Sequence, residues 1–223
     1  MPLQERARAT KASIVEGAAA VFEEIGYGNA SLSSVAERAG VTKGALYFHF
    51  KSKEDLALAV IEAQHALATQ EGERIAGLGR SALSTIILTC ASFGRLLVQE
   101  PVVRAGVRLT LEASAFGHSV TAPYEDWIRT MEFLTRQGQS EGEIDEALDT
   151  AAFARYLVAS FTGVQMVSGV LTHRADVLER IEDMWSILLP AMVPETKLAE
   201  FLDLARLGVH EADPAEGRSG HSV

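Results

Sequence analysis

One short segment constrains the fold of this chain more than any other. In residues 31–50, SLSSVAERAGVTKGALYFHF, two stretches with apolar residues at helical spacing flank a turn at Gly40. The spacing predicts one helix over 32–39 and a second from 43 to 49, and Thr42 stands where an N-cap residue belongs. Two short helices joined by a short turn around a glycine form a helix-turn-helix, whose second helix lies in the major groove of DNA.

Helices are also predicted on both sides of this motif. Apolar residues recur at helical spacing over 6–25, and Gly26 follows as a residue that ends a helix. After the motif, Ser52 begins a sequence like a capping box, which opens a long helix over 53–75. We therefore predict an N-terminal three-helix DNA-binding domain over residues 1–52.

The second helix of the motif carries side chains expected at the DNA. Leu46 and Phe50 lie four residues apart and face the core, whereas Gly44 lets the start of the helix approach the duplex. Tyr47, Phe48 and Phe50 also fit a purely structural core, and three helices with a glycine turn occur in proteins that never bind DNA. The predicted DNA contacts are Arg6 and Arg8, expected on an N-terminal arm, and Ser31, Thr42, Lys43, Gly44, Tyr47, His49 and Lys53.

Charge is unevenly spread along the chain, whose net charge is −10. Residues 1–53 hold seven basic and five acidic groups, whereas the remaining 170 residues hold 13 basic and 25 acidic groups. A mildly basic head on an acidic body indicates that the head meets a polyanion.

Composition favours helices and a reducing compartment. Hydrophobic residues make up 48% of the chain, and the dominant Ala and Leu are strong helix formers. The single cysteine, Cys90, excludes an intrachain disulfide, as is typical of a cytoplasmic protein. We expect no apolar run near the roughly 18 residues that span a membrane, no secretory signal and no membrane partner.

The rest of the chain predicts an all-α body over 53–208. Helices are expected over 81–99, 101–114, 124–137, 147–171, 175–189 and 196–207, with a loop at 115–123, a turn at 138–145 and a disordered tail at 209–223. The apolar helices 147–171 and 175–189, the second with Trp185, carry more apolar surface than one subunit buries. We expect these two helices at a dimer seam, with Trp185 in the interface or in the core.

Single polar residues within apolar helices indicate a small-molecule site in the body. A buried polar group costs about 1–3 kcal/mol unless it is paired, and a ligand is one way to pair it. Four such residues are Gln64, Thr89, Thr162 and Gln165, and Trp127 adds a flat face with one donor. The alternative is that Trp127 is core and that Thr162 bonds to its own helix.

Enzyme chemistry has little support in the sequence. The chain contains no His-x-x-x-His or Cys-x-x-Cys pair, no P-loop and no Gly-x-Gly-x-x-Gly. The segment GHSVT at 117 lacks the second glycine of a nucleophile elbow. We predict no catalytic residue, no metal site and no cofactor. A helical adaptor that does not bind DNA remains a further alternative.

Residues 10–58 resemble the TetR family of transcriptional repressors. The resemblance rests on FEEIGYGNASLSSVAERAGVTKGALYFHFKSKEDL, with the G-Y before the second helix, the A-G-V-T-K-G-A-L-Y-x-H-F core and the following K-x-x-L. It implies an all-helical homodimer with an N-terminal head that binds operator DNA and a C-terminal body that binds an effector. The second helix of the motif is the family's usual one and says little about the operator sequence.

Body segments resemble the γ-butyrolactone receptor branch of that family, actinomycete repressors that respond to lipid-like signals and govern antibiotic production. The segments are LLVQEPVVRAGVRLTLE, PYEDWIRTM and MWSILLPAMVP. The resemblance implies that Trp127 lines the ligand pocket and that Gln64 and Thr162 bond a γ-butyrolactone or butenolide effector. The implied walls are Leu88, Phe133, Val158, Phe161 and Gln165. An avenolide-type receptor, or a pseudo-receptor that answers to antibiotics or biosynthetic intermediates, remains an alternative.

The expected mechanism links the two parts through helix 53–75, which carries Lys53 at the DNA and Gln64 at the pocket. Two heads bind half-sites about one helical turn, roughly 34 Å, or a simple multiple of it apart on a palindromic operator. An effector that favours a state with the heads spread apart releases the operator.

Overall fold

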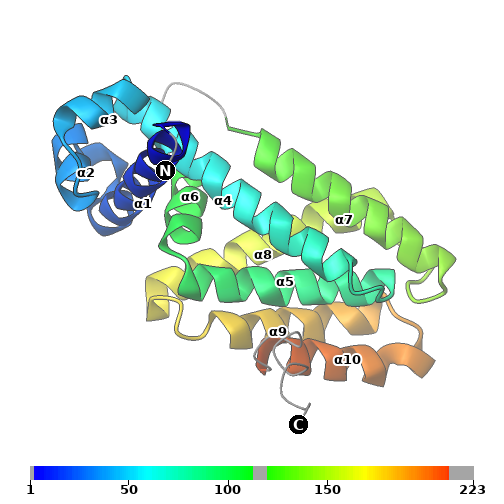
Figure 1. Cartoon of the computed structure of the whole chain (residues 1–223). Helices are drawn as coiled ribbons and strands as arrows, with labels where there is room; N and C mark the ends of the chain where they lie inside the picture. Colours follow the sequence, from blue (N-terminus) through cyan, green and yellow to red (C-terminus); the bar gives the residue numbers. More distant parts are fainter. Residues whose placement is uncertain (1–2, 113–119, 211–223) are drawn as a thin grey trace, which may run out of the picture. The chain divides into compact units, whose positions relative to one another are not determined.

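The computed structural model describes residues 3–112 and 120–210, and this part of the chain is almost entirely helical (Figure 1). The predicted all-α fold is confirmed, with no strand among the described residues. The elements are α1 (Leu3–Asn29), α2 (Leu32–Arg38), α3 (Lys43–His49), α4 (Lys53–Ala76), α5 (Ala82–Gln99), α6 (Pro101–Leu111), α7 (Ala122–Ser140), α8 (Thr150–Thr172), α9 (Val177–Leu188), the 3-10 helix η2 (Leu189–Ala191) and α10 (Glu195–His210).

The chain divides into two compact units, and α4 and α5 each contribute to both. Unit 1 comprises Met1–Gln70 and Leu96–Pro123, and unit 2 comprises Glu71–Arg95 and Tyr124–Val223. The helix-turn-helix therefore shares a unit with α6 and most of α4, a different division from the predicted domain boundary after residue 52.

Unit 1 is built around the helix-turn-helix. Its core includes Ile14 and Phe22 of α1, Leu46 of α3 and Leu56 of α4, all of them 0–1% exposed. Helix α6 packs along α1, where the guanidinium of Arg108 donates to the carbonyl of Glu23. These contacts fix α3 on a rigid frame.

Gly26 interrupts α1, as the sequence predicts. Its φ of 76° and ψ of 162° are not helical, and a side chain at this position would meet the guanidinium of Arg108 at 2.9 Å. A left-handed φ beside a close neighbour favours glycine. Arg6 and Arg8 lie in the first turns of α1, and their contact with DNA stays a prediction.

Unit 2 is a helical bundle in which α9 packs against both α8 and α10 (Figure 1). Trp185 of α9 is fully buried within the single chain and belongs to this core. Of the two predicted roles for Trp185, the interface is therefore wrong and the core is correct.

Two helices of unit 2 run three residues past their predicted ends, and α8 begins at Thr150, three residues after its predicted start. Helix α7 continues through Gly138, where a Cβ would lie 2.7 Å from Ile144 Cδ1, and the reversal comes at Gly142 with a φ of 66°. Gly138 thus allows close packing of α7 against Ile144 and does not form the turn. Helix α10 runs to His210 and buries Val209, which the prediction placed in the tail. Residues 211–223 of the predicted tail lie outside the described part. Most of the predicted loop 115–123 also lies outside it.

Helix α5 departs from the expectation that no segment matches a membrane span. Its 18 residues have a mean hydropathy of 1.4 and are long enough to cross a bilayer, but 67% of them are buried in the protein. Burial of this kind is also what a core helix shows.

Candidate functional site

The helix-turn-helix has both of its helices capped by their own side chains. Ser31 Oγ accepts from the backbone N–H of Ser34 at 3.0 Å, and Ser34 Oγ accepts from the N–H of Ser31 at 3.1 Å, which completes a capping box. Thr42 Oγ1 accepts from the N–H of Ala45 at 3.1 Å. Each cap satisfies an N–H that would lack a helical partner, so α2 and α3 begin where the sequence predicts.

One face of α3, together with its N-cap, is open to solvent and carries four of the nine predicted DNA contacts. Thr42, Lys43 and Gly44 are exposed, and a Cβ at Gly44 would meet only Thr42 Oγ1, at 3.9 Å. Tyr47 is 55% exposed. The opposite face, with Leu46, is buried as predicted.

Phe48 is the most exposed large aromatic on α3, at 81%, and the sequence did not identify it as a site residue. Its ring meets the half-buried ring of His49 edge-on, with the centroids 5.2 Å apart. Two residues past Leu46, position 48 falls on the opposite side of the helix. That spacing is the signal that would have separated Phe48 from the core aromatics.

Lys53, which the sequence predicts at the DNA, binds backbone carbonyls of its own chain. Its ammonium donates to the carbonyls of Tyr27, Gly28 and Ala30 at 2.8, 3.3 and 3.0 Å, and it lies 4.4 Å from the centroid of the Tyr27 ring. An ammonium has three donors, and all three are used. Lys53 therefore fastens the start of α4 to the end of α1.

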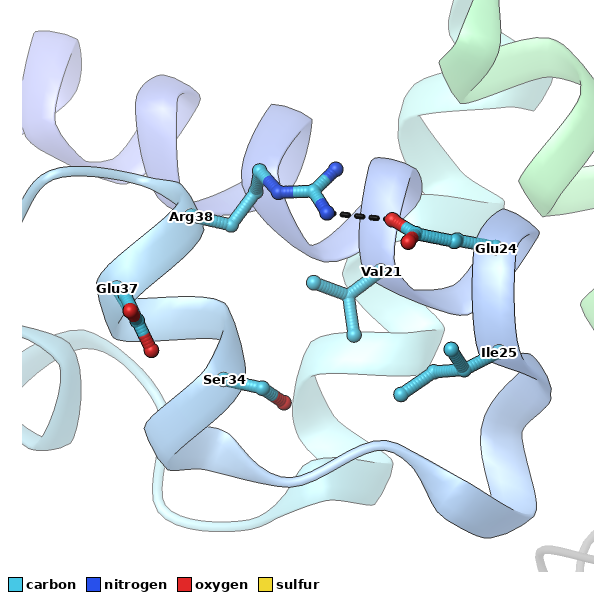
Figure 2. A pocket seen from close by; sticks show the side chains of 6 residues that line it. All are labelled: Val21, Glu24, Ile25, Ser34, Glu37 and Arg38. Carbon is cyan, nitrogen blue, oxygen red and sulfur yellow. Dashed lines mark hydrogen bonds and ion pairs between the residues drawn. The ribbon is translucent and has the colours of Figure 1, made fainter.

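A surface pocket of about 460 Å³ lies in unit 1 between α1 and α2 (Figure 2). Its lining is mixed, with an ion pair between Arg38 and Glu24 above apolar groups. The lining residues are Val21, Glu24, Ile25, Ser34, Glu37 and Arg38. None of them belongs to either predicted site.

Three aromatic side chains meet in unit 2. The ring of Phe93 on α5 lies 6.1 Å from that of Trp127 on α7 and 5.6 Å from that of Phe161 on α8. Gly72 of α4 faces Trp127, whose Cη2 would lie 4.0 Å from a Cβ at that position. We call Phe93, Trp127 and Phe161 the aromatic cluster. The sequence identified two of its members and missed Phe93.

Gln165 lies one turn beyond Phe161 on the buried face of α8 and is 2% exposed. Neither its amide oxygen nor its amide nitrogen has a hydrogen-bond partner among the described residues. Thr162, in contrast, donates to the carbonyl of Val158 at 2.8 Å. Of the two polar residues that the sequence singles out on α8, Gln165 is thus the one whose side-chain polar atoms have no hydrogen-bond partner among the described residues.

The other residues predicted at the pocket are Val158, Phe133, Leu88 and Gln64. Val158 is half-buried and its carbonyl accepts from Thr162. Phe133 is 65% exposed, and Leu88 packs against Gly208 of α10. Gln64 is buried in unit 1, where its stem packs against Gly106 of α6.

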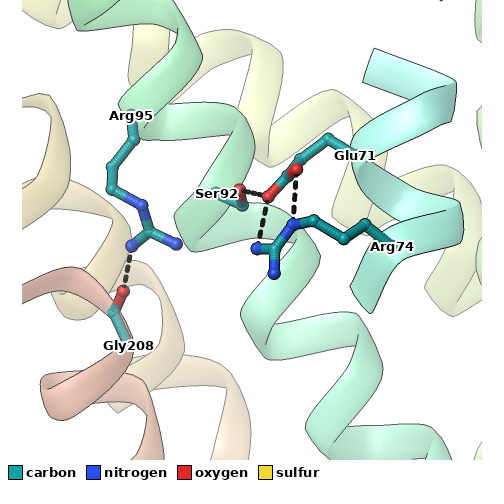
Figure 3. A network of polar contacts seen from close by, with 5 residues as sticks. All are labelled: Glu71, Arg74, Ser92, Arg95 and Gly208. Carbon is teal, nitrogen blue, oxygen red and sulfur yellow. Dashed lines mark hydrogen bonds and ion pairs between the residues drawn. The ribbon is translucent and has the colours of Figure 1, made fainter. Parts of the chain in front are cut away.

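A polar network in unit 2 involves Glu71, Arg74, Ser92, Arg95 and Gly208 (Figure 3). The Glu71 carboxylate accepts two hydrogen bonds from Arg74, each of 2.8 Å, and one from Ser92 Oγ of α5. The bonds from Arg74, and then that from Ser92, lower the pKa of Glu71 against the raising effect of burial. Arg95 donates to the carbonyl of Gly208. The network therefore ties α4 to α5, and α5 to α10.

Helices α8 and α9 expose several large apolar side chains. They are Met166 at 45%, Val167 at 47%, Val170 at 80%, Leu171 at 65% and Ile187 at 73%. No cluster of three His, Cys, Asp or Glu side chains suited to a metal occurs among the described residues.

The N-terminal and the C-terminal parts of the chain each match a known protein family. Residues 14–60 match the family described as bacterial regulatory proteins, tetR family, and residues 80–194 match a tetracyclin repressor-like C-terminal domain. The A-factor receptor protein of Streptomyces griseus is 36% identical over 221 residues, covering 97% of this chain and 77% of the relative.

Solved structures show the same relationship. A γ-butyrolactone receptor (ArpA-like protein) superposes with a TM-score of 0.80 at 34% identity, covering 93% of this chain and all of that one. CprB of Streptomyces coelicolor in complex with its operator gives 0.80 at 33% identity, over 93% and 100% of the two chains. A structure described as the basis for control of antibiotic production by bacterial hormones gives 0.78 at 38%, over 83% and 98%.

These matches span the helix-turn-helix and the helical body together. They identify a DNA-binding transcription regulator and not an enzyme. The chain belongs to the TetR family of bacterial regulatory proteins, and an A-factor receptor and γ-butyrolactone receptors are its relatives over most of their length.

Proposed function

We propose that this protein is a homodimeric repressor that binds palindromic operator DNA and is released by a γ-butyrolactone- or butenolide-type molecule, so that it controls antibiotic production. The observation that carries the effector assignment is the unpaired amide of Gln165 beside the aromatic cluster. The relatives named above support the chemical class of the effector.

The DNA half of the proposal rests on the exposed face of α3. Lys43 and the N-terminus of α3 are suited to phosphate, while Tyr47 and Phe48 offer ring surface for base edges such as thymine methyls. The DNA is in the bacterial cytoplasm, and we place the protein there.

The homodimer rests on the apolar side chains that α8 and α9 leave exposed. Val170 and Ile187 are 80% and 73% exposed in the single chain. Contiguous exposed apolar surface marks an interaction site, and a second copy of these two helices would cover it in a two-fold arrangement.

The effector half rests on an apolar environment with one unsatisfied polar group. A buried amide without partners costs about 1–3 kcal/mol for each unmet group. A lactone or butenolide offers a carbonyl for the amide nitrogen and a hydroxyl for the amide oxygen of Gln165, and its alkyl chain suits the rings of Phe93, Trp127 and Phe161.

Two variants test this site against a panel of butyrolactones, butenolides and antibiotics. Release of an operator fragment, selected from random duplexes by the wild type, is the measurement. Trp127→Ala should weaken the response to the active compound about tenfold or more, because a large contact surface is lost. Gln165→Leu should weaken it similarly while raising the melting temperature, because it removes an amide that has no partner in the free protein.

Phe133→Ala is the control, since this side chain is exposed and lies outside the aromatic cluster. It should respond like the wild type. Release by antibiotics but by no lactone or butenolide would identify a pseudo-receptor, and a Gln165→Leu variant that responds normally would remove Gln165 from the site.

A further inference from the structure

The Glu71–Ser92 hydrogen bond joins α4 to α5 at a buried position. Ser92 is 4% exposed and Glu71 is half-buried. Glu71 Oε1 accepts from both Ser92 and Arg74, and Oε2 accepts from Arg74 Nε. A charge-assisted bond of this kind is stronger than a neutral one, so this contact holds the last turns of α4 on α5 (Figure 3).

The same residues are chain neighbours of the effector site. Gly72 follows Glu71, and a Cβ at this position would lie 4.0 Å from Trp127 Cη2, while Phe93 follows Ser92 and contacts Trp127 and Phe161. Each of the two helices thus gives one residue to the polar contact, and the next residue lies in the aromatic cluster or faces it. A molecule that enters between Gly72 and the aromatic cluster, to which α5 contributes Phe93, must move α4 away from the cluster or displace Trp127.

We propose that Glu71 and Ser92 form a latch that closes when the aromatic cluster is empty and opens when an effector fills it. This inference rests on the proposed function, because it gives the regulation of the same site. Helix α4 is continuous from Lys53 to Ala76, and Lys53 fastens its other end to α1. Opening the latch frees the end of the helix whose start is tied to the DNA-binding helices.

If the latch exists, its removal should change the affinity for the effector in a specific direction. An effector binds the open state, so its apparent affinity equals the affinity of the open state multiplied by the fraction of protein that is open. Removing the Ser92 hydroxyl destabilises only the closed state and should therefore tighten effector binding. A residue with a merely structural role would weaken effector binding or leave it unchanged.

The test compares Ser92→Ala with Ser84→Ala. Ser84 is on the same helix, but its hydroxyl bonds Ser81 and not α4. The probe is a synthetic γ-butyrolactone with an acyl chain, and binding is read from Trp127 fluorescence in a Trp185→Phe background. Ser92→Ala should bind the lactone about tenfold more tightly, the equivalent of one charge-assisted hydrogen bond. It should also need less lactone to release the operator.

Two further measurements make the result decisive. Amide hydrogen exchange over residues 72–76 without lactone should be faster in Ser92→Ala than in Ser84→Ala. Glu71→Gln, which keeps an oxygen for Ser92, should shift lactone affinity in the same direction by a smaller factor. Unchanged exchange, or faster exchange with unchanged or weaker lactone binding, overturns the latch. A wild type that no lactone releases instead overturns the proposed function and the latch with it.

Discussion

The stem of Gln64 on α4 lies directly against Gly106 on α6, such that a Cβ at position 106 would be 2.3 Å from Gln64 Cβ. Because Gln64 Cβ is fixed to the backbone, rotation of the side chain cannot relieve this contact. Gly106→Ala should lower the free energy of unfolding by about 1–2 kcal/mol, since overpacking outweighs the gain in helix propensity. Urea denaturation measures the change.

Gly28→Ala is the matched control for Gly106→Ala. A Cβ at Gly28 meets no atom within 4 Å among the described residues, so its effect should stay within about 0.5 kcal/mol. A Gly106→Ala protein as stable as the wild type would show that α4 and α6 separate easily.

Lys53 is expected to contribute to stability and not to phosphate binding. Lys53→Met leaves the carbonyls of Tyr27, Gly28 and Ala30 without the ammonium, and should cost about 1–3 kcal/mol. Lys51, which is exposed, is the control. The salt dependence of operator binding should keep its slope in Lys53→Met, whereas Lys43→Met should reduce it by about one. A reduced slope for Lys53→Met would show that Lys53 contacts a DNA phosphate.

Phe48 should matter for operator binding and hardly for folding. Its side chain is 81% exposed, so Phe48→Ala should change the melting temperature little. Loss of its ring surface at the duplex should weaken operator affinity by about 1–2 kcal/mol, or roughly tenfold. A gel shift with the selected operator tests this. Equal affinity in Phe48→Ala and wild type would exclude Phe48 from the interface.

The turn between α8 and α9 should be sensitive to acid through Asp176. Its carboxylate accepts from Ser168 at 2.6 Å and from Thr172 at 2.7 Å, and it pairs with Arg180 at 2.8 Å. The bond from Ser168, then that from Thr172, lowers the pKa of Asp176 from 3.8 to about 2. A lowered pKa means that the contribution to stability is present above pH 3.8 and is lost as the pH falls through about 2.

Melting temperatures of Asp176→Asn and wild type, measured from neutral pH downward, test this sign. The variant should melt lower at neutral pH, and the gap should close as the pH approaches 2. Asp203→Asn removes an exposed pair with Arg206 and should differ little from wild type at any pH. A gap for Asp176→Asn that widens in acid would contradict the assignment.

A charge on the exposed apolar surface of α8 should separate the proposed homodimer. Val170→Glu should sediment as a monomer, because an unpaired carboxylate in an apolar interface is strongly unfavourable. Leu207→Glu, on α10 and 45% exposed in the wild type, should remain dimeric. A Val170→Glu protein that still sediments as a dimer would show that Val170 is not in the dimer interface.

Much of the fold could be predicted because its signals are local. The apolar spacing around Leu46, the N-cap at Thr42 and the break at Gly26 each depend on residues within one or two turns, and the structure confirms α3 to the residue. The predictions that failed, such as the turn at Gly138 and the helix end at Leu207, concern the ends of elements. There, packing against a distant residue such as Ile144 decides the outcome.

The all-helical fold, the helix-turn-helix and the family follow from the amino-acid sequence alone, because helical periodicity, caps and a motif depend on consecutive residues. The three-dimensional structure was needed to show that Lys53 binds backbone carbonyls, that Phe93 contacts Trp127 and Phe161, and that Gln165 is buried without a partner among the described residues. Each of these depends on which distant side chains come within a few ångströms. That proximity follows from how helices pack, which the spacing of residues along one helix does not specify.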